Sequence, residues 1–499
     1  MDNNKSNWLK TIKNDQYIFR SDTVAKAYEN LNSSAKGILL LIDSSGMLIR
    51  TVTDGDLRRL LLSGSSINDT LSLLTNQEPV VAGTEDSASD ILTKMNRFQI
   101  SQIPILSDEK KPIGIVYRQH IDNKILLSTP HMGDMEKTYV SKAFSTNWVA
   151  PIGPNLDAFE IELANKMQVR YAVAVSSGTA AIHLALKVLG VEANDIVFCS
   201  SFTFIASANP IIYLGAKPVF IDSDEDTWNM SPSALKRAFL DAESKGKLPK
   251  AVVVVNLYGQ SANYQKICEI CDHYQVAIVE DAAESLGATY NDRYSGTIGR
   301  IGIYSFNGNK IITTSGGGML VTNEKELADK AKFLSTQARE PVPWYEHKEV
   351  GYNYRMSNIL AGVGLGQLKV LDKRVEARRN VFERYVELLS NSPEIKWMPE
   401  ANFGQSTRWL STAQIDLPGI NILLITKILL SHGIECRQVW KPLHLQPIFK
   451  KYKYFTHAKN GNSICDNLFK NGICLPSSSH LTIEQQRRVA DSLKSAIKP

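Results

Sequence analysis

The chain of 499 residues is too long for one ordinary domain, so two or three domains are expected. Its 43% hydrophobic and 21% charged residues are typical of a globular protein, and the formal charge of +5 is too small to indicate nucleic-acid binding. The sequence shows no signal peptide after Met1 and no apolar run long enough to span a membrane. Its six cysteines are scattered along the chain. We therefore expect a cytoplasmic protein without a disulfide framework.

Residues 1–127 are expected to form a module of their own, because one pattern of elements occurs there twice. The first copy combines a helix, two short strands and a further helix, predicted at residues 21–33, 38–43, 48–51 and 53–62. The second copy repeats the helix and the two strands, at residues 85–99, 103–106 and 113–117. This repeat indicates a small α+β module built from two similar halves.

The order of elements in this module resembles a CBS-domain pair, a nucleotide-sensing module. The resemblance is carried best by residues 46–60, where the Ser/Thr-x-x-Asp/Asn element of the family matches Thr53 and Asp56. It implies that these side chains contact the ribose and phosphates of an adenine nucleotide. The second repeat has Tyr117 and His120 at the corresponding places. The alternative is that Thr53 and Asp56 only cap a helix.

A short linker is predicted at residues 128–134, where a proline and a glycine interrupt the periodic pattern. Beyond it, helix and strand signals alternate, which predicts an α/β fold with a mostly parallel sheet and helices on both faces. This large domain is expected to span residues 135–375. A smaller carboxyl-terminal α/β subdomain, with a helix at residues 381–389, is expected to span residues 376–499.

The strand predicted at residues 171–175 runs directly into a helix through Ser-Ser-Gly-Thr-Ala-Ala. The first amides of a helix lack partners within the helix and lie at its positive end, so they suit a phosphate. Gly178 would let the backbone approach closely, and Thr179 adds a hydroxyl group. The alternative is an ordinary capped helix. Phe204, after the next strand, could lie against a flat aromatic cofactor or belong to the core.

A second polar cluster follows the strand predicted at residues 277–279. Asp281 lies at the carboxyl end of this strand, where open α/β sheets bind ligands. An aspartate there can pair with a protonated pyridine nitrogen, and Glu284 could reach a hydroxyl of the same ring. The alternative for Asp281 is a helix cap. Cys268 and Cys271 precede this strand on a helical pattern without a second ligand pair, so we expect core packing and no metal site.

The third segment reads Ser-Phe-Asn-Gly-Asn-Lys and places Lys310 five residues after Ser305. It lies between an apolar strand and the glycines at 316–318. A lysine in this setting can hold an aldehyde cofactor as a Schiff base, while the serine hydroxyl binds the phosphate of that cofactor. Taken with the two earlier segments, it predicts a site for a phosphorylated aromatic aldehyde.

Four ordered segments carry a resemblance to one family, at residues 176–181, 280–287, 305–310 and 351–357. The last of them reads Gly-Tyr-Asn-Tyr-Arg-Met-Ser. From about residue 130 to its end, the chain resembles the DegT/StrS sugar-nucleotide aminotransferases, which are fold-type I enzymes of pyridoxal phosphate (PLP). In particular, it resembles bacterial exopolysaccharide and glycan enzymes that aminate the 4-keto group of UDP-linked 4-keto-6-deoxy sugars, as in bacillosamine biosynthesis.

This resemblance implies a role for each matched residue. Lys310 would form the Schiff base with PLP, Asp281 would pair with the ring nitrogen, and Glu284 would approach the ring oxygen, where many relatives have Gln. Phe204 would stack on the ring. The phosphate would be held by Gly178, Thr179, Ala180 and Ser305. Asn353 would reach the cofactor phosphate of a neighbouring subunit, so a homodimer is expected.

In relatives the segment like residues 435–444 lies near the sugar nucleotide, and four basic residues of this chain could pair with its diphosphate. They are Arg355, Arg437, Lys441 and His444. For each of them the alternative is a solvated surface position. The predicted substrate site therefore depends on the resemblance more than the cofactor site does.

The expected reaction is transamination of a UDP-2-acetamido-4-keto-2,6-dideoxyhexose to the 4-amino sugar, with glutamate as donor, for surface polysaccharide or glycan biosynthesis. The alternatives within the enzyme class are a GDP-4-keto-6-deoxymannose 4-aminotransferase of the perosamine type and a 3-aminotransferase. An alternative of another class is a regulator whose CBS pair senses a ligand and whose transferase part is an inactive scaffold. The intact Ser305, Lys310 and Asp281 argue against that alternative.

Overall fold

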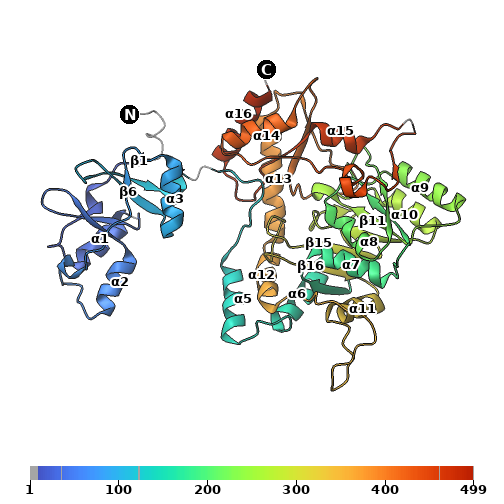
Figure 1. Cartoon of the computed structure of the whole chain (residues 1–499), viewed down its shortest axis with the longest axis horizontal. Helices are drawn as coiled ribbons and strands as arrows, with labels where there is room; N and C mark the ends of the chain where they lie inside the picture. The colour runs from blue at the N-terminus through green and yellow to red at the C-terminus, as the bar shows by residue number, and fades with distance from the viewer. Residues whose placement is uncertain (1–8, 35, 122–123, 460, 498–499) are drawn as a thin grey trace. The chain divides into compact units, whose positions relative to one another are not determined.

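The computed structural model describes residues 9–34, 36–121, 124–459 and 461–497, and the chain divides into the compact units 1–124 and 125–499. Figure 1 shows the elements of each unit. The residues on which the signal-peptide expectation rests, 1–5, lie outside this description. In the described part of the chain, no helix is both long and apolar enough to cross a membrane.

The amino-terminal unit contains two small sheets of matching design. In the first, β2 pairs in parallel with β3, which forms an antiparallel pair with β4, and in the second β5, β6 and β7 repeat this arrangement. The strands of the two sheets are β2 (Tyr17–Ile18), β3 (Leu39–Ile42) and β4 (Leu48–Val52), then β1 (Leu9–Lys10), β5 (Ala82–Gly83), β6 (Gln102–Leu106) and β7 (Pro112–Tyr117). The helices are α1 (Val24–Ser34), α2 (Asp54–Leu62), α3 (Ala88–Phe98) and α4 (Arg118–Ile121). The predicted internal repeat is confirmed.

The second unit is built on an eight-stranded sheet of order β20-β10-β9-β11-β12-β15-β16-β8. Its strands are β8 (Tyr171–Val175), β9 (Ile196–Ser200), β10 (Lys217–Ile221), β11 (Ala251–Val255), β12 (Ala277–Asp281), β15 (Ile301–Ser305), β16 (Gly318–Thr322) and β20 (Tyr454–Phe455). The pairs from β20 to β15 are parallel, and only β16 runs against its neighbours. Strand β11 is buried along its whole length, as expected for a strand covered by helices on both faces. The predicted mostly parallel sheet is confirmed.

Helices cover both faces of this sheet. One face packs against α7 (Gly178–Val188), α8 (Asn209–Tyr213) and α11 (Lys325–Ser335), whose apolar side chains share one core cluster. The other face packs against α9 (Pro232–Ser244) and α10 (Tyr264–His273) over part of the sheet, with Cys271 buried in that core and Cys268 packed against it. A further cluster joins α6 (Pro154–Met167) and α12 (Asn358–Leu368) to the same sheet.

Helix α12 also packs closely on α5 (Asp134–Ser145), and glycines make this approach possible. A Cβ at Gly366 would lie 2.8 Å from the amide nitrogen of Glu136 in α5. One at Gly364 would lie 2.6 Å from the ring of Phe159 in α6, against which α12 also packs. Both distances are too short for real side chains, so the absence of a side chain sets the spacing of these helices.

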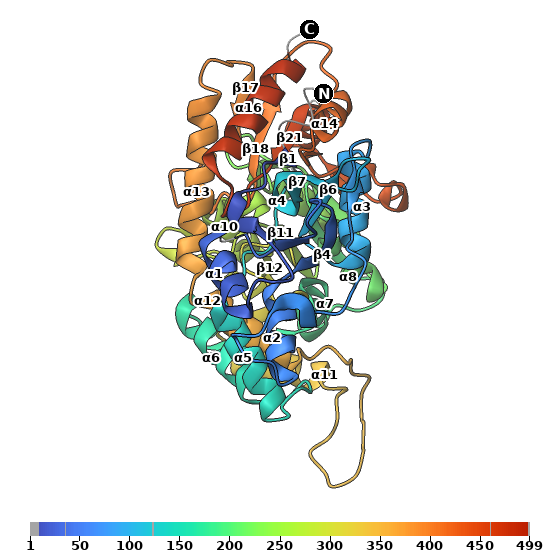
Figure 2. The same cartoon turned by 90° about the vertical axis from the view of Figure 1, so that its left-hand side faces the viewer.

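The carboxyl-terminal subdomain has a four-stranded sheet of order β17-β18-β21-β19. Its strands are β17 (Ile395–Trp397), β18 (Ser411–Ile415), β19 (Arg437–Gln438) and β21 (Gly472–Leu475), and its helices are α13 (Leu371–Leu388), α14 (Ile422–Ser431), α15 (Ile464–Asn471) and α16 (Ile483–Ile497). Figure 2 shows α13, α14 and α16 around this sheet, and their apolar side chains share one core. Helix α13 begins ahead of the predicted start at 381 and runs without a break through the predicted boundary at 375/376.

Residues 125–129, which overlap the start of the segment predicted as a linker, are hydrogen-bonded to this subdomain. Ile125 forms a parallel bridge with Ile434, and the amide of Ser477 donates to the carbonyl of Leu127 at 2.7 Å. The amide of Thr129 donates to the hydroxyl of Ser478 at 3.0 Å. The chain therefore enters the second unit along its carboxyl-terminal sheet before it reaches α5.

Candidate active site

A cavity of about 270 Å³ lies at the carboxyl ends of the parallel strands of the large sheet. Parallel strands present their carboxyl ends at one edge, which is where such sheets bind ligands. The lining residues come from the start of α7, the loop after β9, the end of β12, the loop after β15 and two tryptophans of the carboxyl-terminal part. They are Ser177, Gly178, Thr179, Ile182, Thr203, Phe204, Ala206, Ser207, Val255, Asp281, Ala283, Glu284, Ser305, Asn307, Asn309, Lys310, Gly316, Gly317, Trp409 and Trp440.

Lys310 lies in the loop between β15 and β16, and its side chain is only 13% exposed. Its Nζ lies 3.5 Å from Oε1 of Glu284 and 4.2 Å from the centre of the Trp409 ring. The backbone amide of Lys310 donates to the carbonyl of Asn307 at 3.0 Å, which closes a tight turn. The amine therefore points into the cavity with a carboxylate on one side and an aromatic face on the other.

Asp281 is the last residue of β12 and is 4% exposed. Its carboxylate accepts hydrogen bonds from the hydroxyl of Ser207 at 2.7 Å and from the amide of Ala283 at 3.2 Å. Burial raises the pKa of Asp281, and these hydrogen bonds and the charge of Lys310 lower it in part. The carboxyl group of Asp281 is thus buried at the cavity, held by one hydroxyl and one amide.

Glu284 follows on the turn after β12 and is also buried. It accepts a hydrogen bond from the amide of Tyr258 at 3.0 Å, in addition to the contact with Lys310. Burial raises the pKa of Glu284, while the charge of Lys310 and the hydrogen bond from Tyr258 lower it. Asp281 and Glu284 therefore lie in the same cavity as Lys310, as the sequence analysis predicts.

The start of α7 forms the third wall. Ser177 is the residue before the helix, and its hydroxyl accepts the amide of Ala180 at 3.0 Å. A Cβ at Gly178 would lie 3.1 Å from the Cβ of Ser305, so glycine allows this close approach. Gly178, Thr179 and Ser305 line the cavity, whereas the amide of Ala180 serves the helix cap and Ala180 itself is buried beside the lining.

These groups fit PLP by their chemistry. A phosphate suits the first turn of α7 together with Ser305, a carboxylate for the ring nitrogen is supplied by Asp281, and an amine for the aldehyde is supplied by Lys310. Because Gly178 has no side chain, the start of α7 can approach Ser305 closely, so both can contact the same phosphate. Phe204 lies in the lining with its ring centre 5.3 Å from that of Trp440, and it offers an aromatic face.

The remaining predicted residues lie away from this lining. Asn353 is exposed and pairs with Thr336 in a short antiparallel bridge. Arg355 is buried, paired with Glu160, and donates to the carbonyl of Ala174 at 2.9 Å. The guanidinium of Arg355 is thus already bound within this chain.

The three basic residues predicted near the end of the chain differ in their surroundings. Arg437 pairs with Glu435 at 2.8 Å, and Lys441 is exposed. His444 contacts the hydroxyl of Ser201 at 2.7 Å and the carboxylate of Asp466 at 3.0 Å. Burial lowers the pKa of His444, although Asp466 opposes this shift. His444 therefore joins the large domain to the carboxyl-terminal part.

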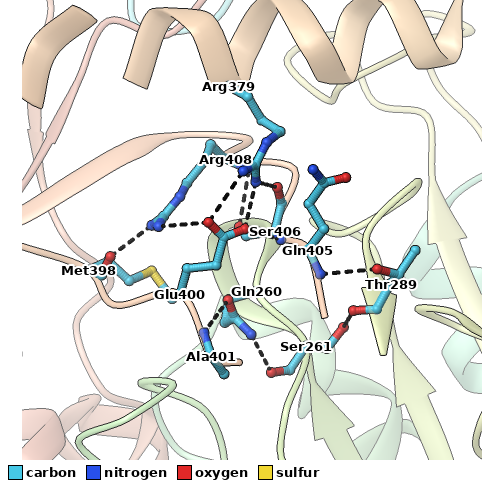
Figure 3. Close-up of polar contacts among 10 residues, drawn as sticks. All are labelled: Gln260, Ser261, Thr289, Arg379, Met398, Glu400, Ala401, Gln405, Ser406 and Arg408. Carbon is cyan, nitrogen blue, oxygen red and sulfur yellow. Dashed lines mark hydrogen bonds and ion pairs between the residues drawn. The ribbon is translucent and has the colours of Figure 1, made fainter. Parts of the chain in front are cut away.

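Trp409 and Trp440 are two of the lining residues that the sequence alone did not assign to the cavity, and Ser207, which bonds to Asp281, is another. The loop before Trp409 is held by ion pairs, shown in Figure 3. Arg408 adopts a left-handed backbone conformation with φ of 50°, donates to the carbonyl of Met398 at 2.7 Å and lies 3.6 Å from Glu400. Glu400 also accepts Arg379 of α13 at 2.6 Å. No local sequence pattern signals these contacts, because they join segments that are distant in the chain.

The amino-terminal unit has a cavity of its own, about 240 Å³ in volume, at which Thr53 and Asp56 both lie. Asp56 accepts hydrogen bonds from the amide and the hydroxyl of Thr53 at 2.8 and 2.6 Å, so it does cap α2. It also pairs with Arg50 at 2.8 Å and Arg59 at 2.9 Å. Thr53 and Asp56 thus serve as a helix cap and also line a cavity with two cationic side chains.

Comparison with known proteins agrees with this geometry. The model of the DegT/DnrJ/EryC1/StrS aminotransferase family matches residues 130–494, and the CBS-domain model matches residues 72–126. The chain is 55% identical to EpsN of Bacillus subtilis, named as a pyridoxal phosphate-dependent aminotransferase, over 74% of this chain and 95% of EpsN. It is 34% identical to the GDP-perosamine synthase of Escherichia coli O157:H7, over 73% of this chain and 96% of that enzyme.

Among solved structures, the fold is similar to that of a Streptococcus pneumoniae protein named as a sugar aminotransferase and determined in its PLP form. The TM-score is 0.68 at 25% identity, and the match covers 75% of this chain and 98% of the other. The CBS match falls on the second repeat, whereas Thr53 and Asp56 lie in the first.

Proposed function

The chain belongs to the DegT/DnrJ/EryC1/StrS aminotransferase family and is a PLP-dependent sugar aminotransferase, and on that premise we propose that it aminates the 4-keto carbon of a UDP-linked 4-keto-6-deoxy sugar with glutamate as donor. One observation carries the proposal of the reacting residues. The amine of Lys310 lies 3.5 Å from Glu284 in the cavity that Asp281 and the start of α7 complete.

When bound there, PLP supplies an electron sink for removal of a proton from the carbon that bears the amino group. The amine of Lys310 would take that proton and deliver it to the former aldehyde carbon of the cofactor, and in the second half of the reaction it would move a proton in the opposite direction, to the sugar carbon. Asp281 would keep the ring nitrogen protonated by pairing with it, and Ser207 holds the carboxylate in place. Glu284 lies beside Lys310, with its Oε1 3.5 Å from the amine.

The aromatic walls of the cavity suit a sugar substrate. Phe204, Trp409 and Trp440 belong to the lining, and apolar ring faces pack well on the CH groups of a deoxy sugar. Asp281 and Glu284 are buried in the same cavity, so a bound substrate would leave little room for water beside the amine. The choice of a UDP-linked substrate rests on the resemblance of the chain to glycan enzymes that act on such sugars, and no single residue decides it.

A GDP-linked 4-keto-6-deoxy sugar is the second candidate. The similarity to a GDP-perosamine synthase over nearly the whole length of that enzyme favours it. To decide between the two, the purified protein is loaded with PLP and incubated with glutamate and a panel of UDP- and GDP-linked 4-keto sugars. Mass spectrometry would show exchange of the keto oxygen for an amino group on the UDP sugar if the proposal is right. Conversion of the GDP sugar alone would refute it and establish the second candidate.

We propose that the enzyme is a homodimer in which Asn353 completes the site of the partner subunit. The side chain of Asn353 is exposed and lies outside the lining of its own cavity. The loop just before it carries large exposed apolar side chains at Trp344, Tyr345 and Val350. Light scattering tests the dimer, and Asn353→Ala should weaken PLP binding about tenfold through one lost phosphate contact. Unchanged PLP affinity in a dimer would contradict the role of Asn353.

We propose that the cavity of the amino-terminal unit binds an adenine nucleotide. Arg50 and Arg59 supply positive charge for phosphates, and Thr53 and Asp56 supply polar groups for a ribose. Titration calorimetry with AMP, ADP and ATP tests the proposal. Thr53→Val should remove binding. If this variant binds the nucleotides as tightly as the wild-type protein does, the proposal is contradicted.

A further inference from the structure

Two donors converge on the carbonyl oxygen of Asn309, the residue directly before Lys310. The hydroxyl of Ser128 donates to this oxygen at 2.6 Å, and the indole nitrogen of Trp409 donates to it at 2.8 Å. A carbonyl oxygen has two lone pairs, so both bonds can be made at once. Both bonds hold the orientation of the peptide group between Asn309 and Lys310. Both donors lie outside the loop of residues 306–317.

Arg378 of α13 ties the two donors together. Its Nη2 donates to the hydroxyl of Ser128 at 3.0 Å, and its Nη1 donates to the backbone carbonyl of Trp409 at 2.5 Å and to that of Ser477 at 3.0 Å. A guanidinium only donates and a carbonyl only accepts, so the hydroxyl proton of Ser128 must point at Asn309. Arg378 is 1% exposed, and burial lowers its pKa to about 9.

The backbone around Ser128 is itself held on both sides. The amide of Leu127 donates to Glu435 at 3.1 Å, and the amide of Thr129 donates to Ser478 at 3.0 Å. The position of the Ser128 hydroxyl is therefore set by contacts with residues that flank β19 and β21 of the carboxyl-terminal sheet. The Trp409 ring, which shares the carbonyl of Asn309, also lies 4.2 Å from the amine of Lys310.

We propose that Ser128 is a positioning residue for amino transfer. By fixing the carbonyl of Asn309, it holds the amine of Lys310 at the position from which it reacts. This inference rests on the proposed role of Lys310. Without the hydroxyl, the carbonyl of Asn309 keeps only the bond from Trp409, and the peptide group before Lys310 gains freedom to rotate. The amine then spends less time at the position from which it takes the proton. The effect should fall on the rate of proton transfer and not on binding of the sugar nucleotide.

The test uses full-length enzyme loaded with PLP. Ser128→Ala should slow the half-reaction with glutamate, followed by the visible absorption of the bound cofactor, about threefold to tenfold, as expected for one lost hydrogen bond. The same variant should shift the pH midpoint of that absorption and leave KM for the sugar nucleotide unchanged. Ser128→Thr keeps the hydroxyl and should restore both the rate and the midpoint.

Thr129→Val is the matched control. It removes the neighbouring hydroxyl, which contacts Ser478 and His480 instead of Asn309. The proposal is overturned if Ser128→Ala keeps the wild-type rate and midpoint, or if Thr129→Val changes them equally. A wild-type protein that stays colourless with PLP would refute the role of Lys310, and this inference with it. A coloured enzyme whose Ser128→Ala variant behaves as wild type would refute the positioning role alone.

Discussion

Replacement of Asp281 by Asn separates the charge of this residue from its shape. The oxygens of Asp281 accept separately, Oδ1 from the amide of Ala283 and Oδ2 from the hydroxyl of Ser207. In the Asp281→Asn variant the remaining oxygen can keep the bond from Ala283, and the NH₂ group can donate to the oxygen of the Ser207 hydroxyl, so the fold and PLP binding should survive. The variant cannot pair with a cationic ring nitrogen in a site where Asp281 is 4% exposed. Removal of one charge from a buried ion pair costs about 3–5 kcal/mol, which corresponds to a loss of about 10²–10⁴-fold in kcat.

The assay is the half-reaction with glutamate, followed by loss of the visible absorption of the bound cofactor in a stopped-flow instrument. Ser207→Ala is the matched control, because it removes one hydrogen bond to the same carboxylate and leaves its charge; about a fivefold loss is expected. A rate for Asp281→Asn within a factor of about three of wild type would refute the electrostatic reasoning, because loss of an ion pair worth about 3–5 kcal/mol would slow the reaction far more.

We also predict that the free energy of unfolding of this variant, relative to wild type, changes with pH. Burial raises the pKa of Asp281 in the cofactor-free fold, so the folded chain holds a proton that the unfolded chain has released. The contribution of Asp281 to the free energy of unfolding is therefore fully present below the ordinary pKa of about 4 and falls as pH rises through the raised pKa. Asp281→Asn should gain stability relative to wild type from about pH 4 towards neutrality, measured by urea unfolding. A relative loss over this range would contradict the raised pKa.

Two further predictions concern neighbouring residues. Lys310→Ala should abolish turnover and the visible absorption of the bound cofactor, and retention of either, measured by spectroscopy and product analysis, would remove Lys310 from the reaction. Glu280→Gln should lower the free energy of unfolding by about 2–3 kcal/mol, because the buried carboxylate accepts backbone amides from residues 296–299 that an NH₂ group cannot replace. Urea unfolding tests this, and a change below about 0.5 kcal/mol would show that the three amides find other acceptors.

Local sequence patterns were sufficient for the elements that carry the cofactor chemistry. The start of α7, the end of β12 and the loop after β15 each combine a buried strand with a polar turn, and this pattern is legible over a few residues. Parallel strands end at one edge of a sheet, so Asp281 and Lys310 could be expected in one cavity. The long-range partners of basic residues could not be read in this way. Arg355 pairs with Glu160 and His444 contacts Ser201, and the partners in each pair are far apart in the chain.

The amino-acid sequence by itself determined the repeat of the first unit, the mostly parallel sheet of the second and the segment that carries Lys310, because hydrophobic periodicity and turn residues act over short distances. Tertiary structure decided what surrounds that lysine. Trp409 reaches the cavity only because Arg408 and Glu400 fold its loop back, and Ser128 reaches the carbonyl of Asn309 only because the chain enters along the carboxyl-terminal sheet. Contacts between distant segments depend on how whole elements pack, and no short stretch of sequence contains that information.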